Sequence, residues 1–127
     1  MTIEAQVHDN FKLFTGKLDE AGHISEVAPE VAKWVAAKKV APKSIGIEFI
    51  ESTKQLILSV GYRDDEPAYN IKLTSQKIGR IQALDADELA RLERAMKAAA
   101  GNSQDVICHE LYVTDTSDLY IVTMSHA

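Results

Sequence analysis

The most regular pattern of apolar and polar positions lies near the C-terminus, between Val106 and His126. Apolar side chains alternate with polar ones on both sides of a turn at residues 115–118. Alternation with a period of two is typical of a strand that buries one face, so the pattern predicts a β-hairpin. A symmetric turn would place His109 opposite Met124. In that register, His109 and His126 share one face of the sheet.

Three further strand-like segments lie in the middle of the chain, at 44–52, 55–63 and 68–78. Each carries apolar residues at every second position. The short link between the first two predicts an antiparallel hairpin. The acidic turn that follows ends at a proline and predicts that the third segment pairs back on the second. Ile50 and Ile57 lie on the parity opposite to the main apolar stripe of this hairpin, so both of its faces are partly apolar.

Helical spacing of apolar residues occurs in three places. A helix is expected at 29–39, with proline in its first turn and Trp34 on its buried stripe. A second helix is expected from Asp85 to Gly101, where a capping box at the start and a glycine at the end mark its limits. Residues 1–24 carry a mixed pattern. Apolar positions there recur at helical steps and predict a peripheral helix, although local alternation also fits a strand.

This order of elements predicts an α+β fold with two layers. We expect one antiparallel sheet of about five strands, made of a meander plus the C-terminal hairpin, with two or three helices on it. The 127 residues fit a single domain, and no segment of the sequence repeats. Because the first hairpin is apolar on both faces, we expect a second subunit to cover the exposed face, as in a homodimer.

Composition narrows the range of functions. The formal net charge is −5 and the basic residues do not cluster, which argues against binding to nucleic acid. The single cysteine, Cys108, fits a reducing compartment. No apolar run reaches the length of a membrane span and no secretory signal is visible, so we expect a cytoplasmic protein without a membrane contact. The glycine motifs of nucleotide sites and the nucleophile elbow of hydrolases do not occur.

Two groups of residues are candidates for binding a ligand or a partner. The first is the pair His109 and His126, because imidazole titrates near neutral pH. A metal would need a third ligand that the spacing does not supply, so we expect no metal and no cofactor. The second is the strand end Tyr62, Arg63, Asp64 and Asp65, where an aromatic ring, a guanidinium and two acids lie together. The alternatives are a hydrogen-bonded sheet histidine with a mobile tail, and a solvated turn.

The leading hypothesis is a small acidic, non-enzymatic module that binds protein or has a regulatory role and acts as a homodimer. The alternative is a small-molecule-binding protein or a modest acid–base enzyme, with a cleft between helix and sheet near His109. A third possibility is a structural component without a ligand. The sequence does not identify a partner, a ligand or a pathway. It also does not show which face of the sheet the helices cover.

Overall fold

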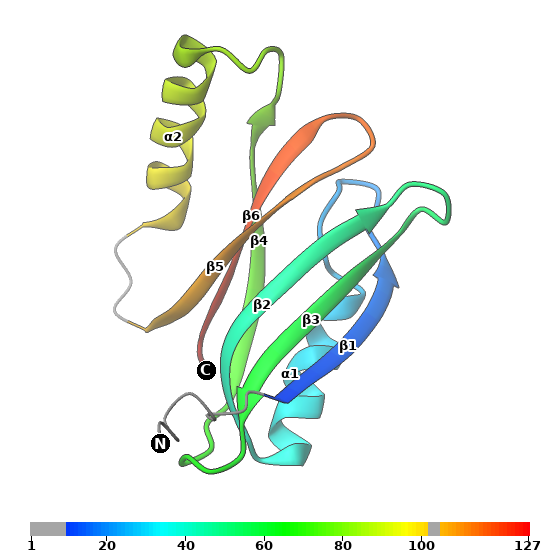
Figure 1. Ribbon diagram of the computed structural model, residues 1–127, viewed down its shortest axis with the longest axis vertical. Coiled ribbons are helices and arrows are strands. Elements are labelled where there is room, and N and C mark those ends of the chain that lie inside the picture. The colour runs from blue at the N-terminus through cyan, green and yellow to red at the C-terminus, as the bar shows by residue number, and fades with distance from the viewer. Residues whose placement is uncertain (1–9, 102–104) are drawn as a thin grey trace, which may run out of the picture.

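The computed structural model describes residues 10–101 and 105–127. Within these residues the chain forms six strands and two helices, and the expected α+β class is confirmed. The elements are β1 (Asn10–Lys17), α1 (Val27–Lys38), β2 (Ala41–Ile50), β3 (Gln55–Arg63), β4 (Ile71–Arg80), α2 (Ala86–Ala100), β5 (Val106–Val113) and β6 (Asp118–His126) (Figure 1).

The strands form two antiparallel sheets of three strands each, and the prediction of one sheet of about five strands is wrong. Sheet A has the order β1-β3-β2, and sheet B has the order β4-β6-β5. The predicted hairpin of β2 and β3 is confirmed. The predicted return of β4 onto β3 is wrong, because β4 pairs with β6 along its length. The acidic segment after β3 is therefore a connection between two sheets.

The two sheets are built by the same sequence of elements. A first unit contains β1, α1, β2 and β3, and a second unit contains β4, α2, β5 and β6. In each unit the last strand lies between the other two. The two outer strands of each sheet therefore run parallel and are joined through a helix, as parallel strands require. The units meet along β2 and β5, which lie side by side (Figure 1).

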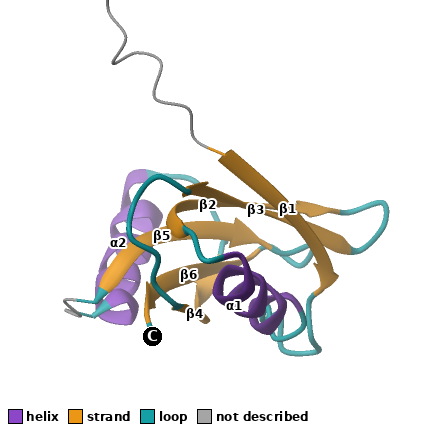
Figure 2. Ribbon diagram, turned by 90° about the horizontal axis from the view of Figure 1, so that it is seen from below, coloured by secondary structure: helices purple, strands orange, loops and turns teal. Residues whose placement is uncertain are grey.

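The main core lies between the two sheets and α1. Side chains from both inner sheet faces, such as Val122, are fully buried together with Val31 of α1. Helix α1 packs on β1 and β4, at the side where the two sheets lie apart (Figure 2). Trp34 lies at the margin of this core. It is half-buried, with its ring edge-on to Phe14 and Tyr62 at centroid distances of 5.8 and 5.1 Å.

A smaller core holds α2 on the outer face of sheet B. Leu92 of the helix is buried there against residues that include Ile121. The predicted cap is confirmed, since the Asp85 carboxylate accepts a hydrogen bond from the Glu88 N–H at 2.9 Å. The reciprocal half of the capping box does not form, because Glu88 accepts from the Gln82 N–H instead, at 2.8 Å.

The helix predicted in the first segment is wrong for the described residues. Residues 10–17 form strand β1 and pair with β3 over their whole length. Val7, which contributed to the helical spacing, lies outside the described residues. This short segment carries both a helical spacing and a local alternation of apolar residues. It forms a strand because it pairs with β3 over eight residues, and such tertiary contacts override weak local preferences.

Candidate functional site

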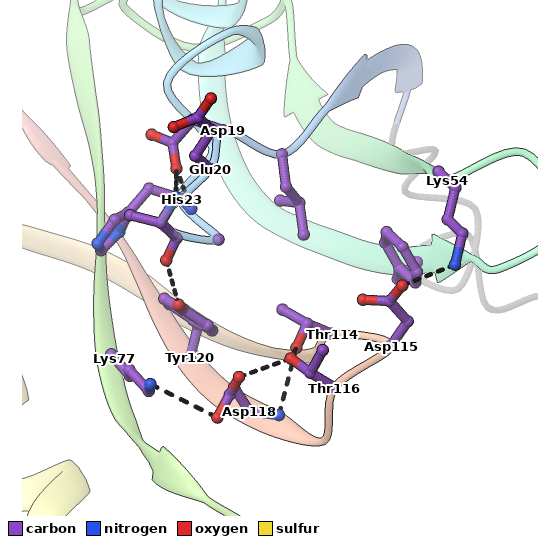
Figure 3. Close-up of a pocket in the computed structure, with 14 residues that line it drawn as sticks. Asp19, Glu20, His23, Lys54, Lys77, Thr114, Asp115, Thr116, Asp118 and Tyr120 are labelled. Carbon is purple, nitrogen blue, oxygen red and sulfur yellow. Dashed lines mark hydrogen bonds and ion pairs between the residues drawn. The ribbon is translucent and has the colours of Figure 1, made fainter.

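A cavity of about 650 Å³ opens at one end of the molecule, where three turns meet (Figure 3). The loop after β1 forms one wall, the β2–β3 turn a second and the β5–β6 turn a third, and β4 adds Lys77. The volume falls in the usual range for small-molecule sites, roughly 300–1,000 Å³.

The first wall is a loop with a defined internal structure. The Asp19 carboxylate accepts hydrogen bonds from the backbone N–H groups of Ala21 and His23, each at 2.9 Å, and from the Ser25 hydroxyl. These bonds, above all the one from Ser25, lower the pKa of Asp19. Gly22 has a φ of +85°. The loop therefore holds one conformation around an ionised carboxylate.

Two tyrosines of sheet B fix this loop in place. The rings of Tyr112 and Tyr120 stack with their centroids 5.0 Å apart. The Tyr120 hydroxyl donates to the Ala21 carbonyl, and the Tyr112 hydroxyl donates to the Gly22 carbonyl at 2.6 Å. Burial raises the pKa of both phenols. They therefore stay protonated at neutral pH and keep donating to the loop.

His23 ties the same loop to strand β4. Its ring lies edge-on to Tyr120 at 5.2 Å, and its Nδ1 lies 2.8 Å from the Ser75 hydroxyl. The backbone N–H of Ile24 also points at that hydroxyl, at 3.5 Å. The contact between imidazole and serine therefore fastens the loop to sheet B. Sequence reasoning missed it because His23 and Ser75 lie far apart along the chain.

The rim of the cavity carries charged groups. Lys54 Nζ lies 2.7 Å from an oxygen of Asp115, and Lys77 Nζ lies 3.5 Å from an oxygen of Asp118. The hydrogen bond from Lys54 lowers the pKa of Asp115. The pKa of Asp118 is lowered mainly by the Thr116 hydroxyl. Both rim carboxylates are therefore ionised at neutral pH.

A second surface of interest is the outer face of sheet A, the face turned away from α1 and sheet B. Phe11, Leu13 and Ile57 lie on it with 68%, 65% and 41% of their surface exposed. In Figure 1 this face looks toward the viewer, and no helix or strand of the described residues covers it. A hollow of about 410 Å³ lies on it, with Leu13, Thr15, Ile50 and Ile57 in its lining.

The structure does not bring the two candidate histidines together. In the C-terminal hairpin His109 lies opposite Thr123, not Met124 as predicted. A slip of one residue moves a side chain to the other face of a sheet. The His109 ring lies on the outer face of sheet B, with Nδ1 3.0 Å from the Thr123 hydroxyl. The His126 ring packs instead on Tyr69, with centroids 4.4 Å apart.

The turn of this hairpin explains the slip. The N–H of Ser117 donates to the Thr114 carbonyl, and the Thr114 N–H donates to the Asp118 carbonyl, both at 3.0 Å. Ser117 has a φ of +62°. A tight turn followed by a residue in the left-handed region is a common three-residue hairpin loop. The symmetric turn assumed from the sequence has its centre half a residue later.

The other predicted group lies at the opposite end of β3 from the cavity. Arg63 forms ion pairs with Asp65 at 2.9 Å and with Glu66 at 3.0 Å. Tyr62 packs on Trp34, and Asp64 is exposed. The arrangement is a charged strand end held by local ion pairs. A binding role for these residues stays a prediction.

No protein-family model, no characterised protein and no solved structure matches this chain. No helix in residues 10–101 and 105–127 is long and apolar enough to cross a membrane. In the same ranges, no three His, Cys, Asp or Glu side chains are grouped in a way that would hold a metal ion. Any functional conclusion therefore depends on the geometry of the described residues.

Proposed function

We propose that the protein is a non-enzymatic interaction module that acts as a homodimer, joined through the outer face of sheet A. The observation that supports this most directly is the exposure of Phe11 and Leu13 on a sheet face that lacks a cover. The outer face of sheet B shows the contrast, since α2 covers it and buries Ile121. Large apolar side chains gathered on an uncovered face are typical of an interaction site.

The shape of the face favours a second copy of the chain as the occupant. The Phe11 ring lies over Gly61 at one end of the face and stands above small residues. The hollow that Leu13 and Ile57 line lies farther along, near Thr15. Phe11 and Thr15 are four positions apart along β1, about 13 Å at the usual rise of a strand. A two-fold arrangement would place each Phe11 in the hollow of the other copy, which makes the face complementary to itself.

Sedimentation velocity of the full chain at micromolar concentrations tests the proposal. We expect a dimer, and we expect Leu13→Ser or Phe11→Ser to weaken it at least tenfold. The reason is that burial of one large apolar side chain contributes about 1.5–3 kcal/mol, and ~1.4 kcal/mol is a factor of ten. Leu84→Ser is the matched control, because Leu84 is 78% exposed but lies just before α2, away from sheet A.

Two results would contradict this function. A monomeric protein at high micromolar concentration would contradict the proposed homodimer. An equal loss of dimer in the Leu84→Ser control would mean that the association is a general effect of exposed apolar residues. Circular dichroism of each variant confirms that the fold is intact, which is expected because all three side chains are exposed.

A further inference from the structure

We propose that the outer edge of strand β4 binds an extended apolar segment of a partner protein, which pairs with β4 as a fourth strand of sheet B. β4 is the edge strand of this sheet on the side opposite β5. Figure 2 shows it at the margin of the sheet, with α1 beside it. The site is distinct from the outer face of sheet A, so this inference goes beyond the proposed homodimer.

The backbone along this edge is unpaired. The Ala127 N–H donates to the Asn70 carbonyl at 3.0 Å, which sets the alternation of the ladder between β4 and β6. In such a ladder every second residue bonds to the neighbouring strand, and the residues between point their N–H and C=O groups away from it. Here the residues between are Leu73, Ser75 and Lys77. Within the described part of the chain these groups make no hydrogen bond, and an unpaired edge is a template for another strand.

Two hollows lie along this edge, on opposite faces of sheet B. The first, of about 280 Å³, has Leu73 and Ala28 of α1 in its lining. The second, of about 500 Å³, has Ile78 and Ala98 of α2 in its lining. Leu73 belongs to the main core on the inner face, and Ile78 belongs to the smaller core on the outer face. His23 lines both hollows, so they adjoin at the edge.

This arrangement fits the side chains of an added strand. Successive side chains of a strand point to opposite faces of its sheet. A segment paired with β4 would therefore direct one side chain into the hollow beside α1 and the next into the hollow beside α2. Alanines of both helices, such as Ala28 and Ala98, leave the room that these side chains need. In recognition by strand addition, backbone hydrogen bonds supply affinity and alternate side-chain pockets supply specificity.

The lining of the hollows selects apolar side chains. Ile24 lines the first hollow and Ile78 the second, and neither lining includes a carboxylate among the described residues. A second copy of β4 fits this edge less well. The side chains that it would direct to the outer face include Lys72 and Gln76, which are polar. The structure therefore favours an apolar segment of a different protein over pairing between two β4 strands.

Fluorescence anisotropy of a labelled heptapeptide with blocked ends, Ser-Thr-Val-Leu-Val-Thr-Ser, tests this site when the peptide is titrated with the full chain. We expect binding that saturates. A second form of the peptide carries methyl groups on its five central amide nitrogens, so it keeps the side chains but loses the donors in every register. This form should bind at least about tenfold more weakly, because several hydrogen bonds to the edge are lost together.

A substitution in the second hollow locates the peptide on the protein. Ala98→Lys should weaken binding of the unmethylated peptide at least about tenfold, the effect of excluding one large apolar side chain from its pocket. Ala36→Lys is the matched control. Ala36 is also an exposed alanine in a helix, lines neither hollow and undergoes the same change of charge. Circular dichroism confirms that both variants keep the fold.

Four results would overturn the proposal. They are the absence of saturation at high micromolar chain, equal affinity for the methylated peptide, an equal loss in Ala36→Lys, and a dimer that excludes the peptide and dissociates in Ala98→Lys. The last result would show that a second copy covers the edge. The Leu13→Ser variant should bind the peptide as the wild type does, because Leu13 lies on the outer face of sheet A. The two surfaces are therefore tested independently.

Discussion

The absence of a side chain at Gly22 is important for the shape of the cavity. Its φ is +85°, and a Cβ there would collide with the Tyr120 hydroxyl. Gly101 at the end of α2 is the natural comparison. Its φ is +66°, but a Cβ would meet no atom within 4 Å. The two glycines therefore separate backbone strain from steric collision.

We expect Gly101→Ala to lower the free energy of unfolding by about 1–3 kcal/mol, because only the unfavourable backbone conformation, with φ +66° and ψ −164°, contributes. Gly22→Ala should cost at least about 1 kcal/mol more, since the tyrosine must also move and lose its bond to the loop. Urea titrations of the two variants measure both values. Equal losses would show that Tyr120 yields without cost and that the loop is not fixed by it.

The roles of the residues at the cavity could not be predicted from the sequence, for a physical reason. Tyr112 and Gly22 form a hydrogen bond although they are 90 positions apart, and no local pattern relates them. The histidines show the opposite problem. Alternation in the last two strands was recognised, but the face of His109 depends on where the turn is centred. That centre is set by Ser117, which adopts a positive φ. A serine in the sequence does not predict this conformation, because positive φ is uncommon for residues other than glycine.

Helix α2 depends on an ionised carboxylate at its first turn. Glu88 is 9% exposed and accepts hydrogen bonds from Arg91 and from the Gln82 N–H. These bonds, first the one from Arg91, lower the pKa of Glu88 from 4.5 to about 2. The folded state therefore binds this proton less readily than the unfolded chain does. The resulting stability is complete above about pH 4.5 and is lost as the pH falls toward 2.

We therefore expect Glu88→Gln to be less sensitive to acid than the wild type. The comparison is the fall in the urea midpoint between pH 6 and pH 3, measured by circular dichroism. Other carboxylates with lowered pKa, such as Asp19, contribute equally to both proteins and cancel in the difference. An identical fall in the two proteins would mean that the bonds of Glu88 do not favour its charged form.

Elements with their own boundary signals were predicted well from the sequence. The cap at Asp85 and the short link between β2 and β3 gave α2 and the first hairpin close to their observed limits. The partner of β4 was not predictable in the same way. The connection from Arg63 to Ile71 can turn back or cross to another sheet, and its composition suits both. The decision lies in segments far away in the sequence: β1 and β2 occupy both edges of β3, and β6 pairs with β4 along its length.

At the scale of the whole molecule, the two units share an architecture but not a separate core. Helix α1 belongs to the first unit and packs on β4 of the second. Val31 and Val35 of this helix are buried in the same cluster as Leu73 and Met124 of sheet B. Each sheet therefore needs the other to exclude solvent from its inner face. The two units therefore repeat one order of elements, but they share a core. The shared core predicts that the whole protein unfolds as one body.

Leu92→Ala tests that coupling. Leu92 lies in the smaller core under α2, so its truncation should cost about 2–5 kcal/mol in the second unit alone. Trp34, the only tryptophan, reports the first unit by fluorescence, while circular dichroism reports the helices. If the units unfold together, both signals should shift to the same lower urea midpoint. A circular dichroism midpoint that falls while the Trp34 midpoint stays would show that α2 detaches by itself, and that the shared core around α1 is sufficient to hold both sheets.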